Sequence, residues 1–145
     1  MGQIHQIVGA SVIIYKDKQV LLQQRKDNKC WAYHGGHVEI GEIVEEAAKR
    51  ELFEETGLTA NSLELFGVFS GSKLHHIYPD GNEVYIIDVV FLCNDFSGAP
   101  VFQVDECLGL QWFEYDSLPE NLSPPIIPAL KKFIEDSDYQ SPAGG

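Results

Sequence analysis

The sequence has few basic residues, and this scarcity limits the partners that the protein can bind. Ten Lys and Arg residues stand against 22 Asp and Glu residues, which gives a formal net charge of −12 over 145 residues. A chain with this charge repels the phosphate backbone of nucleic acids, so we expect no DNA or RNA polymer as a partner. An anionic small molecule would have to be bound through a metal ion.

Long apolar runs and paired cysteines are also missing. No apolar run approaches the roughly 20 residues that cross a bilayer, and no signal peptide is recognisable, so we expect no association with a membrane. Cys30, Cys93 and Cys107 form neither a Cys-x-x-Cys pair nor an even set. This pattern favours free thiols in a reducing compartment, and we therefore expect a cytoplasmic protein.

The length and the composition fit one folded domain. With 44% hydrophobic and 22% charged residues, the chain has the balance of a globular protein. A chain of this length buries roughly 70% of the surface that it exposes when unfolded, which is enough for a substantial core. We predict a single domain over residues 1–136, followed by a disordered tail over residues 137–145. A homodimer remains open.

The segment from residue 36 to residue 58 is the most informative part of the sequence, and it predicts a helix rich in carboxylates. Residues 43–56 contain neither proline nor glycine and are mostly good helix formers. Gly41 can serve as the N-cap, and Gly57 stands where a left-handed C-cap residue belongs. We therefore predict a helix of about 13 residues.

A helical wheel separates the glutamates of this segment into two groups. At 100° per residue, Glu51, Glu54 and Glu55 fall on the side of the apolar core residues, whereas Glu45 and Glu46 point to solvent. Glu54 and Glu55 also lie in the last turn, where the helix dipole is negative. A hard divalent cation, which takes oxygen ligands, would stabilise such an arrangement. The alternative is a solvated, glutamate-rich face that binds nothing.

The same segment resembles the signature of the Nudix hydrolases at every fixed position. The signature residues, at the family's spacing, are Gly36, Glu42, Arg50, Glu51, Leu52, Glu54, Glu55, Gly57 and Leu58. The family's Trp-x-x-Pro-Gly-Gly lead-in is matched from Trp31 to Gly36, except that His34 replaces the proline. The resemblance implies an α/β fold, a Nudix-type α/β/α sandwich with a mixed central sheet. It also implies hydrolysis of a nucleoside diphosphate derivative, with a catalytically silent nucleotide sensor as the alternative.

The resemblance further implies a metal centre that binds Mg²⁺, with Mn²⁺ as an alternative. The expected ligands are all oxygen donors: the Gly36 carbonyl, Glu51, Glu54, Glu55 and Glu106. Arg50 is expected to orient the glutamates, and either Glu54 or Glu106 is expected to be the catalytic base. Glu106 is preferred to Asp105 because of its place just before an aromatic strand. A surface turn is the alternative for both acids.

Residues outside the helix are expected to contact a small-molecule nucleotide. Arg25 is expected to reach a phosphate, as basic residues near this position do in Nudix proteins, with an ordinary surface arginine as the alternative. His37 is expected to line the site or to be merely exposed. Stacking faces and hydrogen bonds for a base or sugar are expected from Trp31, Tyr33, His75, His76, Tyr78 and Tyr85. We expect a nucleoside triphosphate or a nucleotide sugar such as ADP-ribose.

The rest of the chain predicts the strands and the closing helix of such a sandwich. Strands are expected over residues 7–15, 20–25, 63–70, 84–93 and 110–113, and a helix is expected over residues 127–135. The fourth of these strands is apolar enough to be a buried central strand. Asp17 and Lys18 are expected to form a tight turn, residues 71–83 a loop with a Pro-Asp-Gly turn, and Pro124-Pro125 a stop.

Overall fold

A computed structural model describes residues 3–101 and 107–144, with side chains described as far as residue 137. The strands are β1 (Ile4–Lys16), β2 (Gln19–Arg25), β3 (Trp31–Ala32), β4 (His34–His37), β5 (Thr59–Ala60), β6 (Glu64–Phe69), β7 (His75–Ile77), β8 (Glu83–Cys93), β9 (Phe96–Ser97) and β10 (Cys107–Glu114). The helices are α1 (Val44–Thr56), the 3-10 turn η1 (Pro124–Ile126) and α2 (Ile127–Gly144).

The strands form one large mixed sheet and a small ladder. The order in the large sheet is β10-β2-β1-β8-β6, with β3 paired to β2, β4 to β1 and β7 to β8, while β5 and β9 form the ladder. β1 and β8 run parallel, and the other pairs of the large sheet are antiparallel. The prediction of a mixed sheet is therefore confirmed, and β8 is a central strand, as we expected for residues 84–93.

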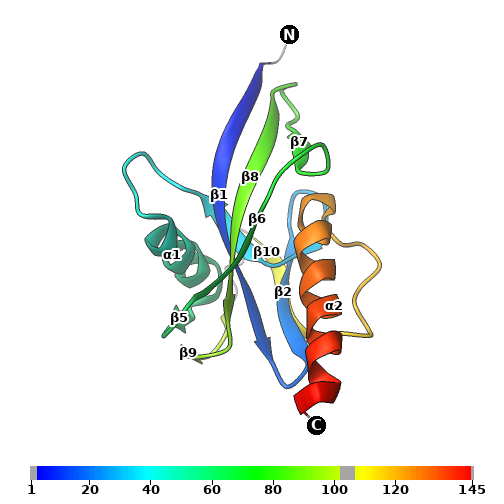
Figure 1. Ribbon diagram of the computed structural model, residues 1–145. Coiled ribbons are helices and arrows are strands. Elements are labelled where there is room, and N and C mark those ends of the chain that lie inside the picture. The colour runs from blue at the N-terminus through cyan, green and yellow to red at the C-terminus, as the bar shows by residue number, and fades with distance from the viewer. Residues whose placement is uncertain (1–2, 102–106, 145) are drawn as a thin grey trace.

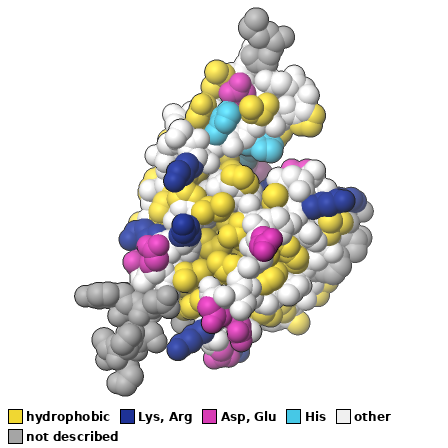
Figure 2. Space-filling model, turned by 90° about the vertical axis from the view of Figure 1, so that its right-hand side faces the viewer, with side chains coloured by type: hydrophobic (Ala, Val, Ile, Leu, Met, Phe, Trp, Pro, Cys, Tyr) yellow, Lys and Arg dark blue, Asp and Glu magenta, His cyan; other side chains and the backbone are white. Residues whose placement is uncertain are grey.

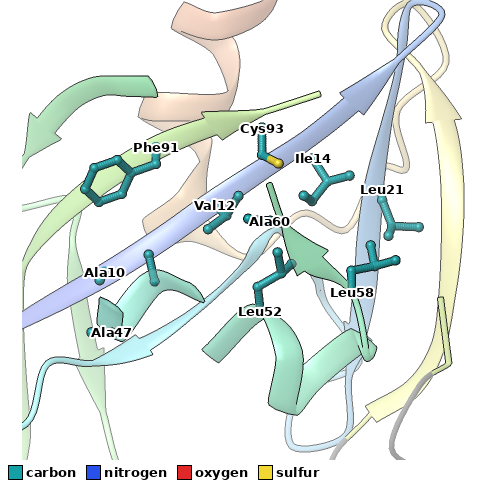
Figure 3. Packing of buried hydrophobic residues seen from close by; sticks show 11 residues of the cluster. Ala10, Val12, Ile14, Leu21, Ala47, Leu52, Leu58, Ala60, Phe91 and Cys93 are labelled. Atoms are coloured by element: carbon teal, nitrogen blue, oxygen red, sulfur yellow. The ribbon is translucent and has the colours of Figure 1, made fainter. Parts of the chain in front are cut away.

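Apolar side chains cover both faces of this sheet, because successive residues of a strand point to opposite sides. In β1, Val12 and Ile14 pack in a cluster with Leu52 of α1, whereas Ile13 packs in a second cluster with Leu130 of α2. Figure 3 shows Val12, Ile14 and Leu52 together in the first cluster. The two helices thus lie on opposite faces of the sheet (Figure 1), which confirms the three-layer sandwich.

Helix α1 begins and ends close to the predicted residues. Gly57 ends it in the left-handed conformation, with φ of 77°, and its N–H donates to the Phe53 carbonyl at 2.8 Å. The N-cap, however, is Ile43 and not Gly41 as we predicted. Gly41 instead takes a φ of 81° in the turn before the helix, where the Glu42 N–H donates to the Glu39 carbonyl. This left-handed backbone conformation favours glycine, so Gly41 belongs to the turn before the helix and is not its N-cap.

The connections differ from the prediction in two places. Residues 71–83 were predicted to be a loop, but they contain β7, which pairs antiparallel with the first part of β8. The predicted Pro-Asp-Gly turn is present, because the Gly81 N–H donates to the Tyr78 carbonyl at 2.9 Å. Pro124-Pro125 opens η1 and leads into α2, whereas we expected a stop. Proline suits the first turn of a helix, where its missing N–H costs nothing.

The backbone of α2 continues to Gly144, although the sequence predicted a helix end at residue 135 and a disordered tail. Two side-chain hydrogen bonds stabilise the helix just beyond residue 135. Lys132 donates to Asp136 one turn further on at 3.3 Å, and the Ser137 hydroxyl donates to the Phe133 carbonyl at 2.8 Å. These contacts span four residues, which is the spacing that a helix brings together.

The surface of the sandwich mixes charges of both signs on the face drawn in Figure 2. There, Lys and Arg side chains lie among Asp and Glu side chains around a broad apolar area, and histidines lie above it. Among the described residues, no helix is both long and apolar enough to cross a membrane.

Candidate active site

A cleft of about 230 Å³ opens over the N-terminal half of β1, between β4 and β8. Its lining combines apolar, aromatic and polar groups: Ile7, Gly9, Ser11, Arg25, Asn28, Tyr33, Gly35, Gly36, His37, His76, Tyr78, Ile86, Asp88, Ser123 and Pro125. Gly36 and His37 belong to β4, and Arg50 of α1 donates to the His37 carbonyl at 3.1 Å. One end of the cleft therefore adjoins the carboxylates of α1.

Arg50 contacts three carboxylates, two on α1 and one in the turn before it. Its Nε donates to Glu42 at 2.8 Å, and its Nη1 lies 2.9 Å from Glu51 and 3.3 Å from Glu54. The hydrogen bond to Glu42 is the main reason why the pKa of Arg50 rises above its ordinary value, and the same bond lowers the pKa of Glu42. A planar guanidinium can serve several carboxylates at once, which a lysine ammonium does less well. Arg50 thus fixes the side chains of Glu42 and Glu51.

Glu55 points in the opposite direction, into the protein, and is only 8% exposed. Its Oε1 accepts hydrogen bonds from the Gln23 amide and from the Gly35 N–H. Burial, together with a hydrogen bond to the Glu51 carboxyl, raises the pKa of Glu55 well above its ordinary value. Of the described residues, His34 supplies the only basic nitrogen within 4 Å, with Nδ1 at 3.8 Å from Oε1.

His34 cannot neutralise Glu55, because burial lowers the pKa of its ring to about 4. The ring is fully buried, and its Nε2 bonds the Leu21 carbonyl at 3.0 Å, while Nδ1 has no hydrogen-bond partner among the residues that the structure describes. The histidine that replaces the family's proline therefore does not loosen the turn. It lies in β4, paired with Val12 of β1, so its backbone is held in the sheet.

Gly36 brings the β4 backbone against α1. A Cβ at this position would lie 2.5 Å from both carboxylate oxygens of Glu51, so no larger residue fits without displacing that carboxylate. The close approach places the Glu51 carboxylate directly against the β4 backbone at Gly36. This is the kind of donor set that hard divalent cations take.

The donors around Glu51 fit a divalent cation, although among residues 3–101 and 107–137 no group of three or more acidic, His or Cys side chains is arranged around one point as a formed metal centre. Glu51 and Glu54 turn towards Arg50, while Glu55 turns inward. In the described part of the chain, no Lys or Arg nitrogen lies within 4 Å of the buried carboxyl of Glu55, and Glu51 lies within hydrogen-bond reach of it. Nudix hydrolases generally use divalent metal ions, and a cation bound here would provide the missing positive charge.

The sequence-predicted substrate contacts divide into residues that reach the cleft and residues that do not. Arg25 and His37 line it, as do Tyr33, His76 and Tyr78. Trp31 packs edge-on against Phe113 at 5.0 Å between ring centroids, and Tyr85 stacks on His75 at 4.6 Å. Trp31, His75 and Tyr85 are not among the cleft residues. Glu106 and Asp105 lie outside the described residues.

Sequence reasoning missed the most buried acid of the cleft, Asp88. It is 6% exposed in the middle of β8, and its two carboxyl oxygens accept hydrogen bonds from Ser11 Oγ at 2.7 Å and from the Tyr33 hydroxyl at 2.9 Å. Burial raises the pKa of Asp88, although the two hydroxyls act against this shift. The signal was present, because a lone aspartate interrupts a strand that is otherwise apolar over residues 84–92.

Comparison with known proteins agrees with this fold and site. A family model described as NUDIX domain matches residues 5–136. The ADP-ribose pyrophosphatase of Methanocaldococcus jannaschii is 38% identical over 120 residues, which cover 81% of this chain and 67% of that protein. The oxidized purine nucleoside triphosphate hydrolase of Danio rerio is 35% identical over 112 residues, which cover 74% of this chain and 66% of that protein.

A solved structure shares most of this fold as well. The crystal structure of a MutT NUDIX hydrolase from Burkholderia pseudomallei superposes with a TM-score of 0.76 at 33% sequence identity, over 87% of this chain and 96% of that chain. The family model, the two relatives and this structure agree with the signature residues on α1. The chain therefore belongs to the Nudix hydrolase family, as one of its pyrophosphohydrolases.

Proposed function

We propose that this chain is a Mg²⁺-dependent hydrolase that cleaves the diphosphate linkage of a nucleoside triphosphate or of a nucleotide sugar such as ADP-ribose. The observation that carries the proposal is the junction at Gly36, where the cleft meets the carboxylate of Glu51. The names of the two relatives support both substrate classes, one being an ADP-ribose pyrophosphatase and the other a nucleoside triphosphate hydrolase.

The oxygen donors at this junction hold the cation in our proposal: Gly36 through its carbonyl, Glu51, Glu54 and Glu55. Their hard character favours Mg²⁺, with Mn²⁺ as an alternative. When bound, such an ion neutralises the charge of the diphosphate and assists attack by water. Glu55 is buried beside Glu51, and a divalent cation between them would favour the ionised form of both carboxyls.

The protein's own residues then orient the reacting groups and receive a proton. Arg50 holds Glu51 and Glu54, so that neither side chain has to be ordered when the substrate arrives. The Glu54 side chain is 53% exposed and can accept a proton from water, which makes it one candidate base. Glu106 is the other candidate base and a further ligand. Glu42 anchors Arg50 from the turn before α1.

Arg25 and His37 serve the substrate in this proposal. Arg25 makes a bidentate pair with Asp27, at 3.0 and 2.8 Å, and both side chains are about half exposed. An ion pair exposed to this degree contributes little stability, so the guanidinium can turn from Asp27 to a phosphate at small cost. His37 lies in the cleft wall next to Gly36, where the diphosphate would pass. The substrate is a small molecule, and free thiols at Cys30 and Cys93 suit a cytoplasmic location.

Turnover of a nucleotide panel tests the proposal. Nucleoside triphosphates, ADP-ribose and a second nucleotide sugar are incubated with Mg²⁺, and phosphate release is read with and without added phosphatase or pyrophosphatase. We expect release only after the auxiliary enzyme acts, because the primary products are a nucleoside monophosphate with pyrophosphate or with a sugar phosphate. Turnover that persists in excess EDTA would contradict the metal assignment, and binding without any turnover would favour the sensor.

A further inference from the structure

Gln23 is a polar residue on the face of β2 that packs against α1. Alternate residues of a strand share a face, and Leu21, two residues earlier, packs in one cluster with Leu52 of α1 (Figure 3). Gln23 therefore points towards the same helix, and its backbone lies between β3 and β10 in the sheet. A partly buried amide is costly unless hydrogen bonds satisfy it. Its hydrogen-bond partner is the carboxylate of Glu55.

The amide of Gln23 and the backbone of β4 converge on one oxygen of Glu55. Gln23 Nε2 donates to Oε1, and the Gly35 N–H donates to the same atom at 3.4 Å. Each oxygen of a carboxylate has about two acceptor positions, so the protein uses those of Oε1 and leaves Oε2 for another partner. Because the next residue, Gly36, lies against Glu51, one short piece of backbone contacts both carboxylates.

His34, whose ring also lies beside Oε1, cannot replace Gln23 as the donor. Its Nε2 bonds the Leu21 carbonyl, which can only accept, so Nε2 carries the ring proton. The ring is neutral, and Nδ1, at 3.8 Å from Oε1, therefore has no proton to donate. Among the described residues, Gln23 is thus the only nitrogen-bearing side chain that donates to Glu55.

The donor at this position is neutral, which distinguishes Glu55 from the carboxylates that contact Arg50. The guanidinium orients Glu42 and Glu51 and also compensates their charge. The amide of Gln23 orients Glu55 but supplies no charge. Carboxylates that bind metal ions are commonly held by hydrogen bonds in this way, so that their orientation is fixed while their charge remains for the cation.

A purely structural link between β2 and α1 explains the Gln23 contact less well. Leu21 and Leu52 already join the two elements through apolar packing. An amide and a carboxyl that are both withdrawn from water add a desolvation cost, which their hydrogen bond does little more than offset. Two apolar side chains of similar size would join the same elements without that cost. The polar pair is therefore better explained by what it does for Glu55.

We propose that Gln23 is a positioning residue of the metal site. Its amide fixes Oε1 of Glu55 without neutralising the carboxylate, so that the other oxygen and the charge are left for a divalent cation. The inference rests on the proposed function in assigning the cation to Glu51 and Glu55. It goes further by naming a residue outside the signature segment, on β2, that sets the affinity for the cation. Metal binding without a nucleotide tests it separately from turnover.

The test compares wild type with Gln23→Met, which keeps the length of the side chain and removes the donor. Binding of Mn²⁺ is measured by electron paramagnetic resonance and binding of Mg²⁺ by calorimetry, both without nucleotide. We expect the variant to bind either ion about tenfold or more weakly, which is the usual effect of losing a hydrogen bond to a metal ligand. The Mg²⁺ concentration that gives half-maximal turnover should rise by the same factor, with little change of kcat at saturating Mg²⁺.

Gln24→Met is the matched control. Gln24 is the next residue of β2, points to the opposite face and donates to the Lys29 carbonyl at 3.0 Å. This variant should bind Mn²⁺ as wild type does. If Gln23→Met does not fold, Gln23→Lys provides the test, because it places an ammonium beside Glu55. It should raise the melting temperature of the metal-free protein and remove the further rise that Mn²⁺ causes in wild type.

The outcomes separate this inference from the metal assignment on which it rests. A lower melting temperature of Gln23→Met with unchanged Mn²⁺ affinity would make Gln23 a structural residue and would overturn the inference alone. Equal weakening of Mn²⁺ binding in Gln23→Met and Gln24→Met would overturn it as well, because the effect would then belong to β2 in general. A wild-type protein that binds no Mn²⁺ would refute the metal assignment and the inference together.

Discussion

The cleft has an aspartate in its β8 wall and adjoins the carboxylates near α1 at Gly36, and these two ends differ in what compensates the negative charge. At the α1 end, Glu42, Glu51 and Glu54 share the guanidinium of Arg50, while Glu55 is buried and no Lys or Arg nitrogen of the described residues lies within 4 Å of it. At the β8 end, Asp88 accepts from two hydroxyls, and no basic nitrogen in the described part of the chain lies within 4 Å of it. The first arrangement has room for one more positive charge, whereas in the second neutral hydroxyls supply the donors. The carboxylates at the α1 end are thus suited to binding a cation, and the carboxylate at the β8 end is suited to accepting hydrogen bonds.

The largest effect is expected at the α1 end. Glu54→Gln or Glu55→Gln keeps the shape of the side chain but removes the charge that holds the cation. We expect kcat/KM to fall by roughly a hundredfold or more for every substrate, which is about 2.7 kcal/mol of barrier. The measurement is steady-state turnover at saturating Mg²⁺.

Glu45→Gln is the matched control, because Glu45 lies on the solvent-exposed side of the same helix. Its activity should equal that of wild type. Full activity in both Glu54→Gln and Glu55→Gln would contradict the assignment of the metal to this end of the cleft.

A smaller loss of turnover is expected from Glu106→Gln. This variant tests whether a residue from the segment before β10 acts together with the carboxylates of the α1 end. If Glu106 is the base or a ligand, turnover should fall by at least roughly tenfold while the melting temperature changes little. Asp105→Asn is the control and should have a mild effect. Small and equal effects of both changes would favour the alternative, in which this segment is an ordinary surface turn.

The difference in how the charges of Glu55 and Asp88 are compensated also predicts how the melting temperature responds to metal ions. Because Glu55 is buried without a cation, millimolar Mg²⁺ or Mn²⁺ should raise the melting temperature of wild type by binding only the folded state. Glu55→Gln should show a much smaller shift, and Asp88→Asn should keep the wild-type shift. An absence of any shift at metal concentrations that support turnover would contradict a metal-binding role for Glu55.

The smallest effect concerns the stability contributed by Asp88 itself. Because the folded-state pKa is raised, between the ordinary and the raised value the folded protein keeps a proton that the unfolded chain has lost. The stability that this proton contributes is present at low pH and is lost as the pH rises through the folded pKa. Asparagine does not titrate, so Asp88→Asn should gain stability relative to wild type as the pH rises above the ordinary carboxyl pKa of about 4. Urea unfolding over a series of pH values measures this, and a relative loss at the higher pH would show a structural carboxylate.

The two ends also differ in how far the sequence could predict them. Glu51, Glu54 and Glu55 lie within five residues on one helix, so helical periodicity brings them together before any tertiary contact is known. The wheel placed all three on the inner side, which is right for the buried Glu55 and wrong for Glu54, whose side chain is 53% exposed. Glu54 lies 3.3 Å from Arg50 Nη1, and periodicity alone cannot show such a contact.

The β8 end is assembled from residues far apart in the sequence. Ser11 and Asp88 are 77 positions apart and meet only because β1 and β8 pair in parallel. Strand patterns predicted both strands, but pairing partners and register depend on the complete sheet. For the same reason Trp31 and Tyr85 were expected in the cleft, although their side chains pack against Phe113 and His75 instead.

One measurement tests most directly whether the two ends have different roles. It is kcat/KM for the best substrate of the nucleotide panel, determined for wild type, Glu54→Gln and Asp88→Asn over a series of Mg²⁺ concentrations. The account predicts that Glu54→Gln lowers kcat/KM and raises the Mg²⁺ concentration that gives half of its maximal value. It predicts that Asp88→Asn leaves this Mg²⁺ concentration unchanged. A Mg²⁺ dependence that changes equally in the two variants, or in neither, would contradict it.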